Sequence, residues 1–132
     1  MSVIDKLAWL QINDKQVLVA RSKGKTLYYL PGGKRETGES DAAALVREIK
    51  EEISVDLLPA SLTFANTFEA PADGKPAGTL VRMTCYFAAF IGRIAPAAEI
   101  EEVAWLTHVD RPKCSATAKL VLDWLKAQGH IN

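Results

Sequence analysis

The chain has 132 residues, which suits one compact domain that can bury a core without disulfides or structural metals. Its 16 Lys and Arg residues balance its 16 Asp and Glu residues, so bulk attraction to nucleic acid or an anionic membrane is not expected. The first ten residues do not read as a signal peptide, and no apolar run approaches the ~20 residues of a membrane span. We therefore expect a single-domain cytoplasmic protein over residues 1–132. Cys85 and Cys114, far apart and in no CxxC pattern, favour buried thiols over a zinc site.

Three β-prone segments precede a glycine-rich turn in the first third of the chain. Residues 7–12 and 16–20 are apolar and flank the turn residues 13–15, which predicts a β-hairpin. Residues 26–30 predict a short strand that stops at the breaker Pro31-Gly32-Gly33.

The clearest helix is predicted over residues 40–53, with Ser40 or Asp41 capping its start. Its apolar residues recur at helical spacing, which predicts a single buried stripe. The stripe consists of Ala42, Leu45, Val46, Ile49 and Ile53.

The second half of the chain alternates strands and loops before a final helix. Strands are predicted over residues 62–68, 79–91 and 102–107, with a loop at 71–78. The segment 79–91 is apolar on both faces, as is typical of a central strand. A helix over residues 115–128 is predicted to end at Gly129, with an apolar side of Leu120, Val121, Leu122, Trp124 and Leu125. This order predicts a mixed α/β or α+β domain.

The helix at 40–53 also carries a cluster of carboxylates outside its apolar stripe. Glu48, Glu51 and Glu52 fall within a sector of about 100° at helical spacing. Their mutual repulsion would be removed by a bound cation, and oxygen ligands favour Mg²⁺, Mn²⁺ or Ca²⁺. A solvated acidic face is the alternative explanation for such a cluster.

Two neighbouring features favour a metal and phosphate site over a solvated face. Pro31-Gly32-Gly33 can bring backbone close to a ligand, although a plain strand-ending turn would have the same sequence. Glu39 adds a fourth acid near the helix start, where it could instead only complement the helix dipole.

Together these residues resemble the motif of the Nudix hydrolases, G-x5-E-x7-R-E-U-x-E-E-x-G-U, in which U is aliphatic. The matching residues are Gly33, Glu39, Arg47, Glu48, Ile49, Glu51, Glu52 and Val55. From average residue frequencies, the probability that the motif matches by chance at a given position in a sequence is below roughly 1 in 10⁷. Ser54 stands where the family has glycine, so it either adopts positive φ at a cost of ~1 kcal/mol or ends the helix differently.

The resemblance implies a Nudix fold, a mixed β-sheet between helices, and hydrolysis of a phosphoanhydride bond in a nucleoside diphosphate linked to a group X. It implies that Glu48, Glu51 and Glu52, with the carbonyl of Gly32 or Gly33, hold Mg²⁺ or Mn²⁺. Glu48 is the first candidate for the base that accepts a proton from the attacking water or positions it. Arg47 is expected to hold the carboxylates by bidentate hydrogen bonds, and Glu39 to support the metal site.

The resemblance implies further site residues outside the motif. Glu99, six residues before Trp105, is favoured as another metal ligand or base. Arg21 is placed like a phosphate-binding arginine of some family members. Ordinary surface roles remain the alternative for both. Tyr28, Tyr29 and Phe68 could stack on a base, with core packing expected for at least two of them.

The expected partner is a small-molecule nucleotide. The short single-domain chain resembles MutT-like (d)NTP pyrophosphohydrolases, which release pyrophosphate and leave a monophosphate. ADP-ribose or another nucleoside-diphosphate derivative is the alternative substrate, because Pro71 lies where ADP-ribose-cleaving relatives carry a proline. A non-catalytic Nudix-fold sensor of nucleotides is a second class of function, disfavoured because all the motif acids are present. Many relatives are homodimers, but no sequence feature identifies an interface.

Overall fold

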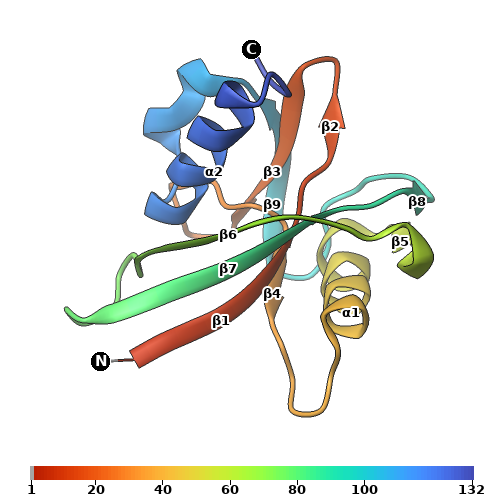
Figure 1. The fold of residues 1–132 in the computed structure, drawn as a ribbon, viewed down its shortest axis with the longest axis horizontal. Coiled ribbons are helices and arrows are strands. Elements are labelled where there is room, and N and C mark those ends of the chain that lie inside the picture. The colour runs from red at the N-terminus through yellow and green to blue at the C-terminus, as the bar shows by residue number, and fades with distance from the viewer. Residues whose placement is uncertain (1) are drawn as a thin grey trace.

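The computed structural model describes residues 2–132, which form a mixed α+β domain as predicted (Figure 1). The strands are β1 (Ser2–Trp9), β2 (Ile12–Asn13), β3 (Gln16–Ser22), β4 (Gly32–Lys34), β5 (Asp56–Leu57), β6 (Thr63–Pro71), β7 (Thr79–Phe87), β8 (Phe90–Ile91) and β9 (Ile100–Leu106). The helices are α1 (Asp41–Ile53) and α2 (Ala116–Ala127), with short 3₁₀ turns at Pro59–Ser61 and His108–Lys113. Within residues 2–132, neither helix is long and apolar enough to cross a membrane.

The strands assemble into a four-stranded sheet of order β4-β1-β7-β6, a three-stranded sheet of order β2-β3-β9 and a β5-β8 pair. β1 runs parallel to β7, whereas β4 and β6 are antiparallel to their neighbours. The four-stranded sheet is therefore mixed, and β7 is a central strand as its apolar sequence predicts.

Two hydrophobic clusters hold the helices on opposite faces of the strands (Figure 1). Successive side chains of a strand point to opposite faces. On β1, Leu7 and Trp9 belong to the cluster that contains α1, whereas Ala8, together with Leu10 just after the strand, belongs to the cluster that contains α2. This alternation places β1 in the middle of the molecule, with α1 on one side and α2 on the other.

Helix α1 begins and ends with serine side chains that hydrogen-bond to backbone. The Ser40 hydroxyl accepts a hydrogen bond from the Ala43 amide at 3.1 Å, which confirms the predicted cap. Ser54 adopts the left-handed conformation, with φ 71°, that the family's glycine would occupy. Its hydroxyl donates to the Ala95 carbonyl at 2.9 Å, so this serine gains a contact that glycine could not make.

The N-terminal hairpin is shorter than predicted. Only Ile12–Asn13 pairs with β3, across a turn in which Asp14 and Lys15 have positive φ. Leu7 to Trp9, which we predicted to lie in the hairpin, extend β1 of the other sheet instead. In the four-stranded sheet these residues pair with β4 on one edge and with β7 on the other, whereas a hairpin with β3 would have given them one partner strand.

The predicted strand over residues 26–30 is wrong, since it is reduced to isolated bridges at Tyr28 and Tyr29. The following Gly32-Gly33, predicted to end a strand, instead forms β4 against β1. A side chain at Gly32 would place Cβ 1.9 Å from the Leu7 carbonyl oxygen, so only glycine allows this pairing.

The predicted strand over residues 79–91 is divided into β7 and β8. Side-chain and loop donors take the backbone carbonyls between them. The Trp9 indole donates to the Ala88 carbonyl at 3.1 Å, and the Leu58 amide donates to the Ala89 carbonyl at 2.9 Å. The remaining predicted strands and α2 are confirmed within a few residues, and Cys85 and Cys114 are buried as expected.

Replacing Ile49 by alanine tests the packing of α1. Ile49 is fully buried, so Ile49→Ala should lower the free energy of unfolding by about 2–5 kcal/mol. Ile91 is 63% exposed, so Ile91→Ala should change it by less than about 0.5 kcal/mol. Urea denaturation measures both, and equal losses in the two variants would contradict this placement of α1.

Candidate active site

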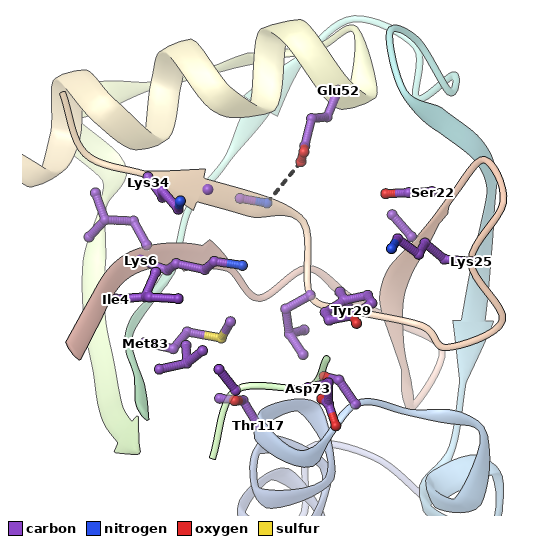
Figure 2. Close-up of a pocket in the computed structure, with 18 of the residues that line it drawn as sticks. Ile4, Lys6, Ser22, Lys25, Tyr29, Lys34, Glu52, Asp73, Met83 and Thr117 are labelled. Atoms are coloured by element: carbon purple, nitrogen blue, oxygen red, sulfur yellow. Dashed lines mark hydrogen bonds between the residues drawn. The ribbon is translucent and has the colours of Figure 1, made fainter. Parts of the chain in front are cut away.

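A cavity of about 430 Å³ opens beside β1 and β4, on the side of the sheet that faces α2 (Figure 2). Gly32 and Gly33 form part of its wall, and Glu52 points toward them from α1 (Figure 2). Glu99, from the segment before β9, lines the same cavity. The glycine loop, one motif acid and the predicted acid outside the motif therefore share one cavity.

The two glycines bring backbone into contact with two carboxylates of α1. The Gly32 amide donates to Glu52 Oε1 at 3.1 Å. A Cβ added at Gly33 would lie 2.4 Å from Glu48 Oε2, so the Glu48 carboxylate occupies the space that any other residue would fill. Gly33 therefore permits the close approach that a backbone ligand and a carboxylate ligand of one cation require.

Arg47 fastens the carboxylate of Glu48 to the loop before α1. Its Nε and Nη2 donate to the two oxygens of Glu39, both at 2.8 Å, and its Nη1 donates to Glu48 Oε1 at 2.9 Å. Nη2 also donates to the Lys34 carbonyl at 3.2 Å. This is the bidentate arrangement expected for Arg47, and it holds the pKa of Glu39 down at about 2, chiefly through the hydrogen bonds from the guanidinium.

Glu51 shares one guanidinium nitrogen of Arg47 with Glu48, but it does not line the cavity as Glu52 does. Its side chain is 56% exposed, and Oε1 lies 3.6 Å from Arg47 Nη1 rather than beside the cavity. Among the residues described, 2–132, no three Asp, Glu, His or Cys side chains converge in a geometry that could hold a metal ion. Glu48, Glu51 and Glu52 thus lie on one face of α1 as predicted, but their carboxylates do not converge on one point.

The environment of Glu52 fits a hard cation nonetheless. The pKa of its carboxyl is raised to about 7, chiefly by burial and in addition by the negative charges of Glu48 and Glu99. The hydrogen bond from the Gly32 amide opposes this rise. A cation among these carboxylates would remove their repulsion. Oxygen donors from carboxylates and from the backbone at Gly33 suit Mg²⁺ or Mn²⁺.

Arg21 does not line the cavity. Its Nε donates to Glu102 Oε1 at 2.8 Å, and its Nη1 donates to the Lys25 carbonyl at 2.9 Å. Ser22 and Lys25 line the wall opposite Lys6 instead (Figure 2). Arg21 therefore contacts the cavity only through the backbone of this loop.

The aromatic candidates divide between the core and the cavity. Phe68 makes an edge-on contact with Trp124, with ring centroids 6.0 Å apart, and Tyr28 packs against the same cluster while donating its hydroxyl to Glu102 at 2.9 Å. Tyr29 lines the cavity (Figure 2). Core packing of two of the three is as expected, which leaves Tyr29 as the ring available to a base.

Sequence reasoning missed the basic residues of the cavity, which are Lys6, Lys25, Lys34 and Lys75. It also missed the contacts that tie the loop before α1 to the sheet. Arg35 pairs with Asp41 and Asp5, and the Tyr86 hydroxyl donates to Asp41 at 2.5 Å. The available signal was a lysine, Lys6, directly before the apolar residues Leu7 to Trp9 of β1.

Residues 7–125, most of the chain, match the model of the family described as NUDIX domain. The chain belongs to the Nudix hydrolases. No curated protein matches this Nudix hydrolase.

Solved structures share its fold. The E. coli ORF135 protein has a TM-score of 0.75 at 21% identity, over 96% of this chain and 91% of that one. A MutT NUDIX hydrolase from Burkholderia pseudomallei has a TM-score of 0.77 at 22% identity, over 93% and 98%. A UDP-X diphosphatase has a TM-score of 0.73 at 18% identity, over 98% and 65%. At these identities the likeness establishes the Nudix fold, as predicted.

The pairing of Glu39 with Arg47 predicts a pH dependence of stability. The folded pKa of Glu39, about 2, lies below its ordinary value of 4.5, so the ionised carboxylate stabilises the protein fully above pH 4.5. This contribution should be lost progressively as the pH falls from 4.5 toward 2. The stability difference between wild type and Glu39→Gln, measured by urea denaturation at several pH values, should shrink over that window. A difference independent of pH would contradict the assignment.

Proposed function

We propose that this Nudix hydrolase cleaves a nucleoside or deoxynucleoside triphosphate to the monophosphate and pyrophosphate, with Mg²⁺ or Mn²⁺ as cofactor. The observation that carries the proposal is the approach of Glu48 and Glu52 to the Gly32-Gly33 backbone at a cavity that also presents lysines. Carboxylates for a cation and ammonium groups for phosphates are the two things a polyphosphate substrate requires. The fold shared with a MutT NUDIX hydrolase supports the same reaction.

The residues proposed to hold the cation are Glu48, Glu52, Glu99 and the backbone of Gly33. Glu51 is proposed to join them by a rotation of its side chain away from Arg47. Such a rotation would suffice because Glu51 lies on the same helix face as Glu48 and Glu52. When bound, the cation supplies charge neutralisation at the phosphates.

Glu48 is proposed to accept the proton of the attacking water. The water oxygen bonds to phosphorus, the phosphoanhydride bond breaks, and pyrophosphate leaves with the bonding electrons. Arg47 keeps the Glu48 carboxylate in one orientation through their 2.9 Å contact and is therefore a positioning residue. Tyr29, which lines the cavity, is proposed to stack on the base.

Arg21 has two candidate roles. Direct binding of a phosphate would require it to release Glu102, which it holds at 2.8 Å. Its contact with the Lys25 carbonyl supports a second role, in which it positions the loop that lines the cavity.

A second candidate substrate is a nucleoside diphosphate linked to another group, such as a nucleotide sugar or ADP-ribose. The observation in its favour is the common fold with a protein described as a UDP-X diphosphatase. Both substrates carry the same scissile bond, so the metal site does not separate them.

Turnover of a substrate panel tests the proposal. With Mg²⁺, we expect release of pyrophosphate from at least one NTP or dNTP, and a loss of about 10²–10⁴-fold in kcat for Glu48→Gln if it removes general-base catalysis. Glu52→Gln should weaken the apparent affinity for Mg²⁺. Release of monophosphates only from ADP-ribose or nucleotide sugars would favour the second candidate. Absence of turnover of every compound would favour a nucleotide sensor.

Two neighbouring acids allow a matched test of the second predicted ligand. Glu99 lines the cavity, whereas Glu101 is turned toward Arg21, with 3.7 Å between their charged atoms. Glu99→Gln should lower kcat/KM at least about tenfold, in keeping with the loss of a metal-site group, and Glu101→Gln should leave it within about twofold. Equal effects of the two substitutions would remove Glu99 from the proposed site.

A further inference from the structure

Lys6 of β1 and Lys34 of β4 are direct cross-strand partners. Residues that face each other across an antiparallel pair project on the same side of the sheet, and like charges at such positions destabilise the pairing. Both side chains line the cavity beside the glycine loop (Figure 2). The free protein therefore holds two ammonium groups together, at a cost in stability, on the wall of the 430 Å³ cavity.

The environment of Lys6 makes this placement costly. Its neighbours on the cavity floor are Ile4, Val81 and Met83. Burial lowers the pKa of Lys6 most, and the charge of Lys34 lowers it next. Within residues 2–132 the Lys6 ammonium forms no ion pair and no hydrogen bond with another side chain.

A third lysine and the nearby acids define the charge around Lys6. Lys75, on the loop between β6 and β7, is close enough to lower the pKa of Lys6 as well, whereas Glu52 and Glu48 raise it from the metal side. Two further acids line the cavity. Asp73 is engaged at α2, where it accepts a hydrogen bond from the Ala116 amide at 3.0 Å, and Glu99 is one of the acids proposed to hold the cation. The lysine side of the cavity therefore has space and charge for an anion.

We propose that Lys6 and Lys34 bind a phosphate group of the substrate that the metal site does not hold. The site would recognise the terminal phosphate of a triphosphate, which carries more negative charge than a phosphate esterified to a group X. Lys6 would then be a specificity-determining residue that favours NTPs over nucleotide sugars. This inference rests on the proposed hydrolysis of nucleotides for its biological meaning, but binding of the anion itself can be measured without hydrolysis.

Inorganic tripolyphosphate in the presence of EDTA is the direct probe, because it offers phosphates without a base and without a metal. Calorimetric titration should show binding to wild type that weakens as salt is added. Lys6→Met and Lys34→Met should each bind at least about tenfold more weakly, which is the loss expected for one charge-assisted hydrogen bond. Lys6→Arg should retain binding. Lys126→Met, an exposed change of equal charge at the end of α2, is the control and should bind as wild type does.

The stability of the same variants without ligand distinguishes a lysine that binds an anion from a lysine that stabilises the fold. Lys6→Met removes the like-charge pair, so its melting temperature without ligand should equal or exceed that of wild type. A lower melting temperature would contradict the like-charge argument.

Kinetics with an NTP and with ADP-ribose complete the test. Lys6→Met should raise KM for the NTP at least about tenfold and change KM for ADP-ribose less, because the lost contact is with a terminal phosphate. Tripolyphosphate binding that is absent in wild type or unchanged in Lys6→Met would overturn the proposal. A loss of NTP affinity with unchanged tripolyphosphate binding would assign Lys6 to the base and likewise overturn it. Lys6-dependent binding without turnover of any nucleotide would support the anion site and reject the proposed hydrolysis.

Discussion

The site depends on the absence of side chains at Gly32 and Gly33. At Gly32 a Cβ would meet the Leu7 carbonyl oxygen at 1.9 Å, and at Gly33 it would meet Glu48 Oε2 at 2.4 Å. The lack of a side chain at Gly32 lets β4 pair with β1, and the lack of one at Gly33 lets Glu48 of α1 approach that strand. The Gly32-Gly33 backbone thus contacts both the sheet and α1 and forms part of the cavity wall. Side chains from β1, α1 and the segment before β9 line the same cavity.

Groups of like charge lie close together on both sides of the cavity of this Nudix hydrolase. On one side of the cavity, the half-buried Glu52 lies near Glu48 and Glu99, and its pKa is raised to about 7, chiefly by desolvation. On the other side, Lys6 faces Lys34 across a strand pair. Each arrangement costs stability until an opposite charge arrives, as is usual where function competes with stability. Arg47, bonded to Glu39 and Glu48, is the exception, since it stabilises the fold and orients a carboxylate together.

Local patterns predicted the helices and the motif residues well, because capping, helical spacing and the motif are all encoded within about 25 consecutive residues. Helix α1 begins after Ser40 as expected, and Arg47 makes the predicted bidentate contact. Strand partners were harder to predict, because pairing of β1 with β7 joins residues far apart in sequence. Lys6 was missed for the same reason, since its role arises from Lys34 and Lys75, which only the folded chain brings near. The outward position of Glu51 depends on side-chain rotation, which helical spacing does not determine.

The substitution Gly33→Ala tests the central claim most directly. The atom that the new methyl group would meet is the end of a flexible side chain, so the fold should survive while Glu48 is displaced. Mn²⁺ binding, followed by the loss of the free-ion electron paramagnetic resonance signal, is the measurement, with the melting temperature as the control. The account predicts a melting temperature near that of wild type and an affinity for Mn²⁺ reduced at least about tenfold, as expected when a metal-site group is displaced. Unchanged Mn²⁺ affinity in a folded Gly33→Ala protein would contradict it.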